Sequence, residues 1–163
     1  MSKSIYIYGF HSIEAQLNSN PECILNVFFQ SGRSDIRISK ITSILSNQKI
    51  SFSKINKNRL DQLTKYELHQ GVVAEVILPQ LPGHEALIEF VTKLSSNPLI
   101  LMLDSIQDPR NLGACLRCAN AAGVDCVVVN KDGSAPINAV VHKTSSGAIN
   151  QLNIFQVTNL VRT

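Results

Sequence analysis

The sequence predicts an α/β protein built of two domains and a short linker. Patterns typical of strands and of helices alternate along the whole chain. The segment ILPQLPGHE, residues 77–85, interrupts them, because Pro79, Pro82 and Gly83 continue neither a helix nor a central strand. Beyond it, the apolar run PLILMLD, residues 98–104, is typical of a parallel strand covered on both faces. We therefore expect a first domain over residues 1–78, a linker over 79–85 and a second domain over 86–163.

The first domain is expected to contain four strands, with helices on both sides of the sheet. The strand patterns are SIYIYG, ILNVFFQ, ISFSKI and GVVAEVIL, at residues 4–9, 24–30, 50–55 and 71–78. Helical patterns cover residues 11–20, 35–49 and 57–65, and Ser12 is the expected N-cap of the first. The spacing of the isoleucines at 38, 41 and 44, with Leu45, gives the second helix one apolar face.

The second domain is expected to alternate helices with three parallel strands. Helices are predicted over residues 84–97, from about Asn111 to Ala122, and from Ser134-Ala135-Pro136 onward. The strands are residues 98–104, 125–130 and 152–157, and TNLVRT at 158–163 has the pattern of a first helical turn. Three parallel strands leave one edge of the sheet unpaired.

Composition favours a globular protein, and its charge is compatible with a polyanionic partner. The 163 residues are 44% hydrophobic and 17% charged, and no apolar run is long enough to cross a bilayer. The start, MSKSIYIYGF, lacks the features of a signal peptide, so we expect a cytoplasmic protein. The net charge is +3, and the basic surplus lies in residues 1–78, with nine Lys/Arg against six Asp/Glu. This mild surplus is compatible with a polyanionic partner or with a solvated surface.

The cysteines and acidic residues give little indication of a metal. Cys115 and Cys118 form a C-x-x-C, but no second ligand pair follows at a zinc-like spacing, so we expect them in the core. Asp104 and Asp108 follow a strand without a phosphate-binding loop, which favours turn residues over a magnesium site.

The segment LDSIQDPRNLGACLRCANAAGVD, residues 103–125, is the best candidate for chemistry. Ligands of open α/β sheets bind at the carboxyl ends of strands and near helix N-termini, which is where this segment turns. Asn111 is the expected helix cap, and Gly113 one turn below Arg117 would leave space for a sugar or phosphate. The alternatives are an ordinary cap, a close helix contact at Gly113, and a surface Arg117 paired with a carboxylate.

The same segment resembles the first signature motif of the SpoU/TrmH family of RNA ribose 2'-O-methyltransferases. That motif has an asparagine, a glycine two residues later and an arginine six later, here Asn111, Gly113 and Arg117. YGFHSIEAQL and HQGVVAEV resemble the ends of the family's N-terminal substrate-binding domain. SAPINAVVHKTSSGA and VTNLVRT resemble the segments after its first motif, so the resemblance runs from about residue 4 to the end.

The resemblance implies a ribosomal-protein-like α/β RNA-binding domain, then a SPOUT α/β domain with a knot that holds S-adenosylmethionine. It implies a homodimer that methylates a guanosine ribose of 23S ribosomal RNA without a metal. Arg117 would be the central catalytic residue, Asn111 would hold the ribose region, and Gly113 would allow close approach. The second and third motifs, which build most of the cofactor site, are expected beyond residue 163, so this truncated chain alone is expected to be inactive.

For RNA, the expected phosphate contacts are basic residues of the first domain: Arg33, Arg37, Lys54, Lys57 and Arg59. The main alternative is a noncatalytic RNA-binding module. A nucleotide-binding oxidoreductase fragment is disfavoured, because no strand is followed by G-x-G-x-x-G.

Overall fold

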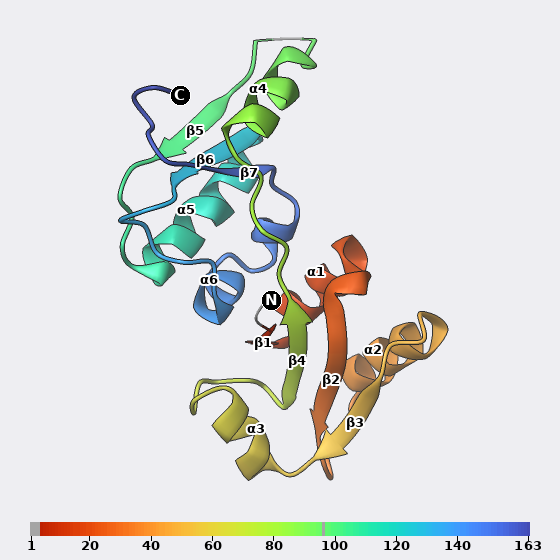
Figure 1. Cartoon of the computed structure of the whole chain (residues 1–163). Coiled ribbons are helices and arrows are strands. Elements are labelled where there is room, and N and C mark those ends of the chain that lie inside the picture. Colours follow the sequence, from red (N-terminus) through yellow and green to blue (C-terminus); the bar gives the residue numbers. More distant parts are fainter. Residues whose placement is uncertain (1–3, 96) are drawn as a thin grey trace. The chain divides into compact units, whose positions relative to one another are not determined.

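The computed structural model describes residues 4–95 and 97–163. These residues form two compact units, one ending at Pro79 and the other running from Gln80 to Thr163 (Figure 1). Each unit combines helices with one sheet, which confirms the predicted α/β class. Among the described residues, no helix has both the length and the apolarity to cross a membrane.

A four-stranded mixed sheet forms the centre of the first unit. Its strands are β1 (Ser4–Tyr8), β2 (Ile24–Gln30), β3 (Phe52–Ile55) and β4 (Val72–Ile77), in the order β1-β4-β2-β3. β4 runs antiparallel to both of its neighbours, and β3 is parallel to β2. β4 contains the six central residues of the stretch GVVAEVIL, as its apolar pattern predicts.

Three α-helices accompany this sheet: α1 (Phe10–Ser19), α2 (Ile36–Asn47) and α3 (Lys57–Leu63), with the short 3-10 helix η1 (Pro21–Cys23). The apolar face predicted for α2 is confirmed by the buried side chains of Ile38, Ile41 and Leu45. The predicted cap at Ser12 is wrong. The N-cap of α1 is Gly9, three residues earlier, so Ser12 lies inside the helix and is buried.

One apolar core joins α1 and α2 to the sheet. Its fully buried members come from both helices and three strands, among them Ile7, Ile13, Val27, Ile41 and Val72. α3 lies against β2 and β4, and its Leu60 is buried outside that cluster. The sheet and the helices therefore fix the segments that link them, including the loop between α3 and β4.

The second unit is a parallel three-stranded sheet with helices on both faces. Its elements are α4 (His84–Thr92), β5 (Ile100–Leu103), α5 (Pro109–Ala122), β6 (Cys126–Asn130), α6 (Ala139–Thr144), the 3-10 helix η2 (Ala148–Asn150) and β7 (Ile154–Val157). The strand order is β5-β6-β7, and both pairings are parallel.

Alternation along β6 divides the core of this unit into two layers. Val127 and Val129 pack with α5 and α6, whereas Cys126 and Val128 pack with α4. Both faces of the central strand are therefore covered, whereas the covering predicted for residues 98–104 is incomplete in β5. β5 has one strand neighbour among the described residues, as expected for an edge, and its Met102 is 47% exposed.

Two helix predictions in this unit need correction or refinement. The helix expected at Ser134-Ala135-Pro136 begins only at Ala139, because Asn138 is the residue whose side chain accepts the free N–H groups of Val140 and Val141. The last residues form a single turn, as expected. In that turn the Thr163 N–H donates to the Asn159 carbonyl, and the Asn159 side chain accepts from the Arg162 N–H.

Candidate functional site

α5 begins at Pro109, two residues before the start that the sequence predicts. The Asp108 carboxylate accepts the Arg110 N–H at 2.8 Å and acts as the N-cap. Pro109 suits the first helical position, because it has no N–H that needs a partner. The prediction that Asn111 caps the helix is therefore wrong, and Asn111 lies exposed in the first turn.

The loop before α5 is tied to the carboxyl ends of two strands. Asn130, at the end of β6, accepts the Ser105 N–H at 3.2 Å and donates to the Asp104 carboxylate at 3.3 Å. The Ser105 hydroxyl donates to the same carboxylate at 2.8 Å. Ser105 has a φ of 53°, which is uncommon outside glycine, so these contacts hold a bend of restricted geometry. The Asp104 carboxylate thus accepts hydrogen bonds from both Ser105 and Asn130.

Gly113 faces another helix and not an opening. A Cβ at this position would lie 1.9 Å from Thr144 Oγ1 and 3.1 Å from the Ser145 nitrogen, at the end of α6. Thr144 therefore occupies the space directly beside Gly113. This removes the geometric basis for a sugar or phosphate at Gly113, and the glycine instead lets α5 approach α6 closely.

Arg117 is exposed on α5, and none of the described carboxylates lies within ion-pair distance of its guanidinium. The alternative of a surface arginine paired with a carboxylate is therefore not what the structure has. Asn111 and Arg117 are six positions apart, which on a helix means about 9 Å along the axis and about 120° around it. The structure places both on one helix but does not bring them together on one face.

The C-x-x-C is divided between two environments. Cys115 packs partly against the core of the second unit, as expected, but Cys118 is exposed, so the prediction that both are core cysteines is wrong for Cys118. A helix places positions three apart on neighbouring but different parts of its surface, and only one of them faces the sheet here.

A small cavity lies where α5 meets the ends of β6 and β7. Its volume is about 180 Å³, and its walls include Leu112 and Leu116 of α5, Val129, Ala135 and Gln156. The inward face of α5 could be predicted from the sequence, but the opposite wall comes from residues distant along the chain. The cavity can accept an apolar group beside the exposed first turn of α5.

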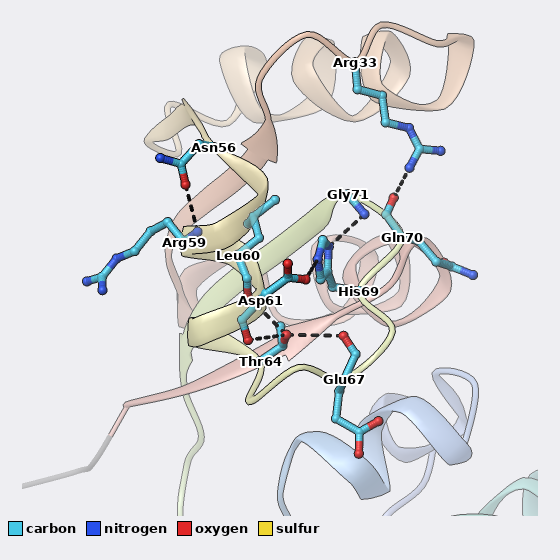
Figure 2. A network of polar contacts seen from close by, with 10 residues as sticks. All are labelled: Arg33, Asn56, Arg59, Leu60, Asp61, Thr64, Glu67, His69, Gln70 and Gly71. Carbon is cyan, nitrogen blue, oxygen red and sulfur yellow. Dashed lines mark hydrogen bonds and ion pairs between the residues drawn. The ribbon is translucent and has the colours of Figure 1, made fainter.

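The basic residues predicted in the first domain lie in different surroundings. The guanidiniums of Arg33 and Arg37 lie 5.5 and 5.6 Å from the centroid of the Phe10 ring. Lys57 and Arg33 both line a surface hollow beside the loop between α3 and β4. Lys54 lies exposed on β3, and Figure 2 shows Arg59 directed away from the side where Arg33 meets Gln70. The roles of these five residues in RNA binding stay predictions.

The loop between α3 and β4 carries a polar network that sequence reasoning missed (Figure 2). His69 is buried; its Nδ1 accepts the Gly71 N–H at 2.9 Å and its Nε2 lies 2.9 Å from an Asp61 oxygen. Because Nδ1 accepts, the proton of the neutral ring is on Nε2, which donates to Asp61. Nothing in the local sequence indicates that His69 has a partner eight residues away.

Two family models match most of the chain. One, described as RNA 2'-O ribose methyltransferase substrate binding, matches residues 6–82. The other, described as the SpoU rRNA Methylase family, matches residues 98–163.

Proteins of similar sequence are RNA methyltransferases by name. The chain is 43% identical over 157 residues to the 23S rRNA (guanosine-2'-O-)-methyltransferase RlmB of Haemophilus ducreyi, covering 96% of this chain and 63% of the relative. It is 40% identical over 163 residues to RlmB of Pseudomonas aeruginosa, covering 100% of this chain and 65% of the relative. The chain thus spans less than two thirds of the length of these relatives.

Among solved structures, the SpoU methyltransferase AviRb of Streptomyces viridochromogenes, in complex with AdoMet, superimposes with a TM-score of 0.74 at 16% identity, over 98% of this chain and 56% of that one. An AdoMet-bound rRNA methyltransferase of Sinorhizobium meliloti superimposes with a TM-score of 0.69 at 17% identity, over 94% of this chain and 54% of that one. At these identities the likeness concerns the fold. With the two family models and the relatives at about 40% identity, it shows that the chain belongs to the SpoU family of RNA 2'-O ribose methyltransferases.

Proposed function

We propose that the protein containing this chain transfers a methyl group from S-adenosylmethionine to the 2'-hydroxyl of a guanosine in 23S ribosomal RNA. The observation that carries the proposal is the α5 segment. It has the asparagine, glycine and arginine of the family's first motif, and Arg117 is exposed with no carboxylate partner in the described chain. The names of the RlmB relatives supply the substrate and the nucleoside.

The cofactor, when bound, supplies an electrophilic methyl group, so the ribose oxygen attacks directly and no protein nucleophile is needed. The 2'-hydroxyl would give up its proton to solvent as it takes the methyl group. The chain's contribution is to position the ribose and to stabilise negative charge as the oxygen loses its proton.

Arg117 suits that contribution, because a guanidinium stays charged at all relevant pH values and can donate two parallel hydrogen bonds to a phosphate or one to a developing alkoxide. Asn111 presents an exposed amide in the first turn of the same helix. The separation of the two around the helix axis means that they would contact different parts of the nucleotide. A homodimer and a cytoplasmic location are expected from the same relationship.

The test is methyl transfer from tritiated S-adenosylmethionine to unmodified 23S ribosomal RNA by the protein containing this chain. We expect Arg117→Ala to lower the methylation rate at least about 100-fold, the size of effect seen when a single transition-state donor is removed. Binding of the RNA should change by less than about tenfold. Arg110→Ala, which removes an exposed arginine from the first turn of the same helix, is the matched control and should retain activity. An unchanged rate in Arg117→Ala would contradict the role given to Arg117, whereas no methyl transfer by the original protein would favour the noncatalytic RNA-binding module.

A further inference from the structure

The loop from Thr64 to Gly71 is held in an unusual backbone conformation. Lys65, Tyr66 and Gln70 have φ values of 54°, 63° and 58°, and Gly71 has 80°. Non-glycine residues in the left-handed region are energetically unfavourable and persist only where surrounding contacts enforce them.

Those contacts come from both ends of the loop. The Asp61–His69–Gly71 chain of hydrogen bonds fixes its second half, and the Thr64 hydroxyl lies 3.1 to 3.3 Å from the carbonyl oxygens of Leu60, Asp61 and Glu67 (Figure 2). The Tyr66 N–H donates to the Asp61 carbonyl at 2.7 Å. Tyr66 nevertheless leaves its side chain 80% exposed. An aromatic ring is thus presented to solvent by a fixed backbone.

Arg33 connects this loop to the start of α2. Its guanidinium donates to the Gln70 carbonyl and, at 2.9 Å, to the Asp35 carboxylate, while lying over Phe10. Gly71 makes room for it, because a Cβ there would lie 2.8 Å from Arg33 Nη1. Arg33 and Gln70 are shared walls of two adjacent hollows, of about 350 Å³ beside Tyr66 and Lys57 and about 580 Å³ beside Arg37 and Ile36.

Arg37 differs from Arg33 in one respect. Its guanidinium is held over the same Phe10 ring, but in the described chain no acceptor engages its N–H groups. The lining carboxylates Asp35 and Asp61 are engaged by Arg33 and His69 respectively, and Glu67 also borders the smaller hollow. The larger hollow therefore combines two guanidiniums with one carboxylate that is already paired.

We propose that these two hollows form a binding track for unpaired RNA, in which the Tyr66 ring stacks on a base and the Arg37 guanidinium binds an adjacent phosphate. The inference rests on the proposed function and specifies how the first unit holds the substrate. Single-stranded nucleic acid is the occupant that fits, because aromatic rings stack on bases that are not enclosed in a helix and arginines bind the phosphates between them. Fixing the loop beforehand lowers the ordering cost of binding.

The test is fluorescence anisotropy with the 163-residue chain and a labelled, non-self-complementary RNA nonamer, with the same sequence closed into a duplex as competitor. Tyr66→Ala should weaken binding of the single strand about tenfold, whereas Tyr66→Phe, which keeps the ring, should bind within about twofold of the original. Arg37→Gln should weaken binding about fivefold and lower the slope of log affinity against log salt by about 0.7.

Lys49→Gln is the control for loss of one positive charge. Lys49 is exposed beyond the far end of α2, about 18 Å along the helix axis from Arg37, and this variant should bind as the original chain does. Circular dichroism and a thermal melt of each variant exclude unfolding as the cause.

Three results would overturn the inference: no binding of the single strand by the original chain, preference for the duplex competitor, or unchanged affinity in both Tyr66→Ala and Arg37→Gln. None of them affects the Arg117 test. Conversely, if the methylation test failed but Tyr66→Ala still weakened RNA binding, the proposed binding track would stand.

Discussion

Arg37 in the first unit and Arg117 in the second are both exposed arginines on helices, but their guanidiniums are held differently. Arg37 lies over a buried aromatic ring beside a second arginine that is itself fixed by two acceptors. Arg117 projects from α5 without an ion-pair partner among the described residues. The guanidinium of Arg37 is thus held by a contact within the chain, whereas no ion pair among the described residues holds that of Arg117.

This difference suggests a division of labour between the units. Groups that are already in place contribute to affinity, because little conformational entropy remains to be lost on binding. A group that interacts more strongly with the transition state than with the bound substrate contributes mainly to the rate. Changes in the first unit should therefore alter RNA affinity, and changes at Arg117 should alter turnover. Single substitutions and a change of pH should likewise affect the stability of one unit without affecting the other.

Gly113→Ala should destabilise the second unit by about 3 kcal/mol, the upper end of the range for overpacking. The added methyl would collide with Thr144 Oγ1, and rotating that hydroxyl away would break its hydrogen bond to the Val140 carbonyl. Alanine is otherwise favoured over glycine within a helix by about 1 kcal/mol, so the sign of the effect is diagnostic. Hydrogen exchange of α5 and α6 amides reports it, and residues 4–79 serve as the internal control. Stabilisation by the substitution would contradict the close contact.

Lowering the pH from 7 to 5 should destabilise the second unit by about 2 kcal/mol through His142. Burial lowers the pKa of this histidine to about 4 in the folded chain, from an ordinary value near 6.5. The unfolded chain therefore takes up the proton first as the pH falls, and the stability is lost between about pH 6.5 and 4. Urea unfolding at both pH values measures the effect, and His142→Gln should flatten it. An NMR titration of His142 with a midpoint above pH 6 would refute the assignment.

Asp61→Ala should loosen the loop of the first unit by about 1 kcal/mol, the usual contribution of one hydrogen bond. Without the carboxylate, His69 loses the acceptor that orients its ring toward the Gly71 N–H. The Gly71 amide should then exchange about fivefold faster, whereas Asp61→Asn keeps an acceptor oxygen and should change little. Equal exchange rates in the two variants would show that the loop is held by other contacts.

Sequence alone predicts the elements with strong periodicity. β4 and α2 follow directly from their apolar patterns, and the parallel order of β5, β6 and β7 is the one expected of alternating strands and helices. Helix starts were less predictable where two residues could serve as caps. Asp108 is the cap where Asn111 was expected, and α6 begins after Asn138 and not at Ser134-Ala135-Pro136, because capping depends on which side chain reaches the free N–H groups.

The site was harder to predict for a different reason. The family motif identified Asn111, Gly113 and Arg117, but what stands against Gly113 is Thr144, thirty-one residues later. The stacking of two arginines on Phe10 and the pairing of His69 with Asp61 also join residues that no local pattern relates. Periodicity indicates which face of a helix is buried, but not which side chain lies opposite.

Because only one cysteine of the C-x-x-C is exposed, a fluorescent dye can be attached at a single native position. Burial raises the pKa of the Cys23 and Cys126 thiols, and Cys115 is half-buried, which leaves Cys118 as the exposed thiol of the four. A maleimide dye should therefore attach there first, since the thiolate is the reacting form and needs access. Such a dye would lie one residue from Arg117, so its emission would report the arrival of a nucleotide at α5 without any engineered cysteine.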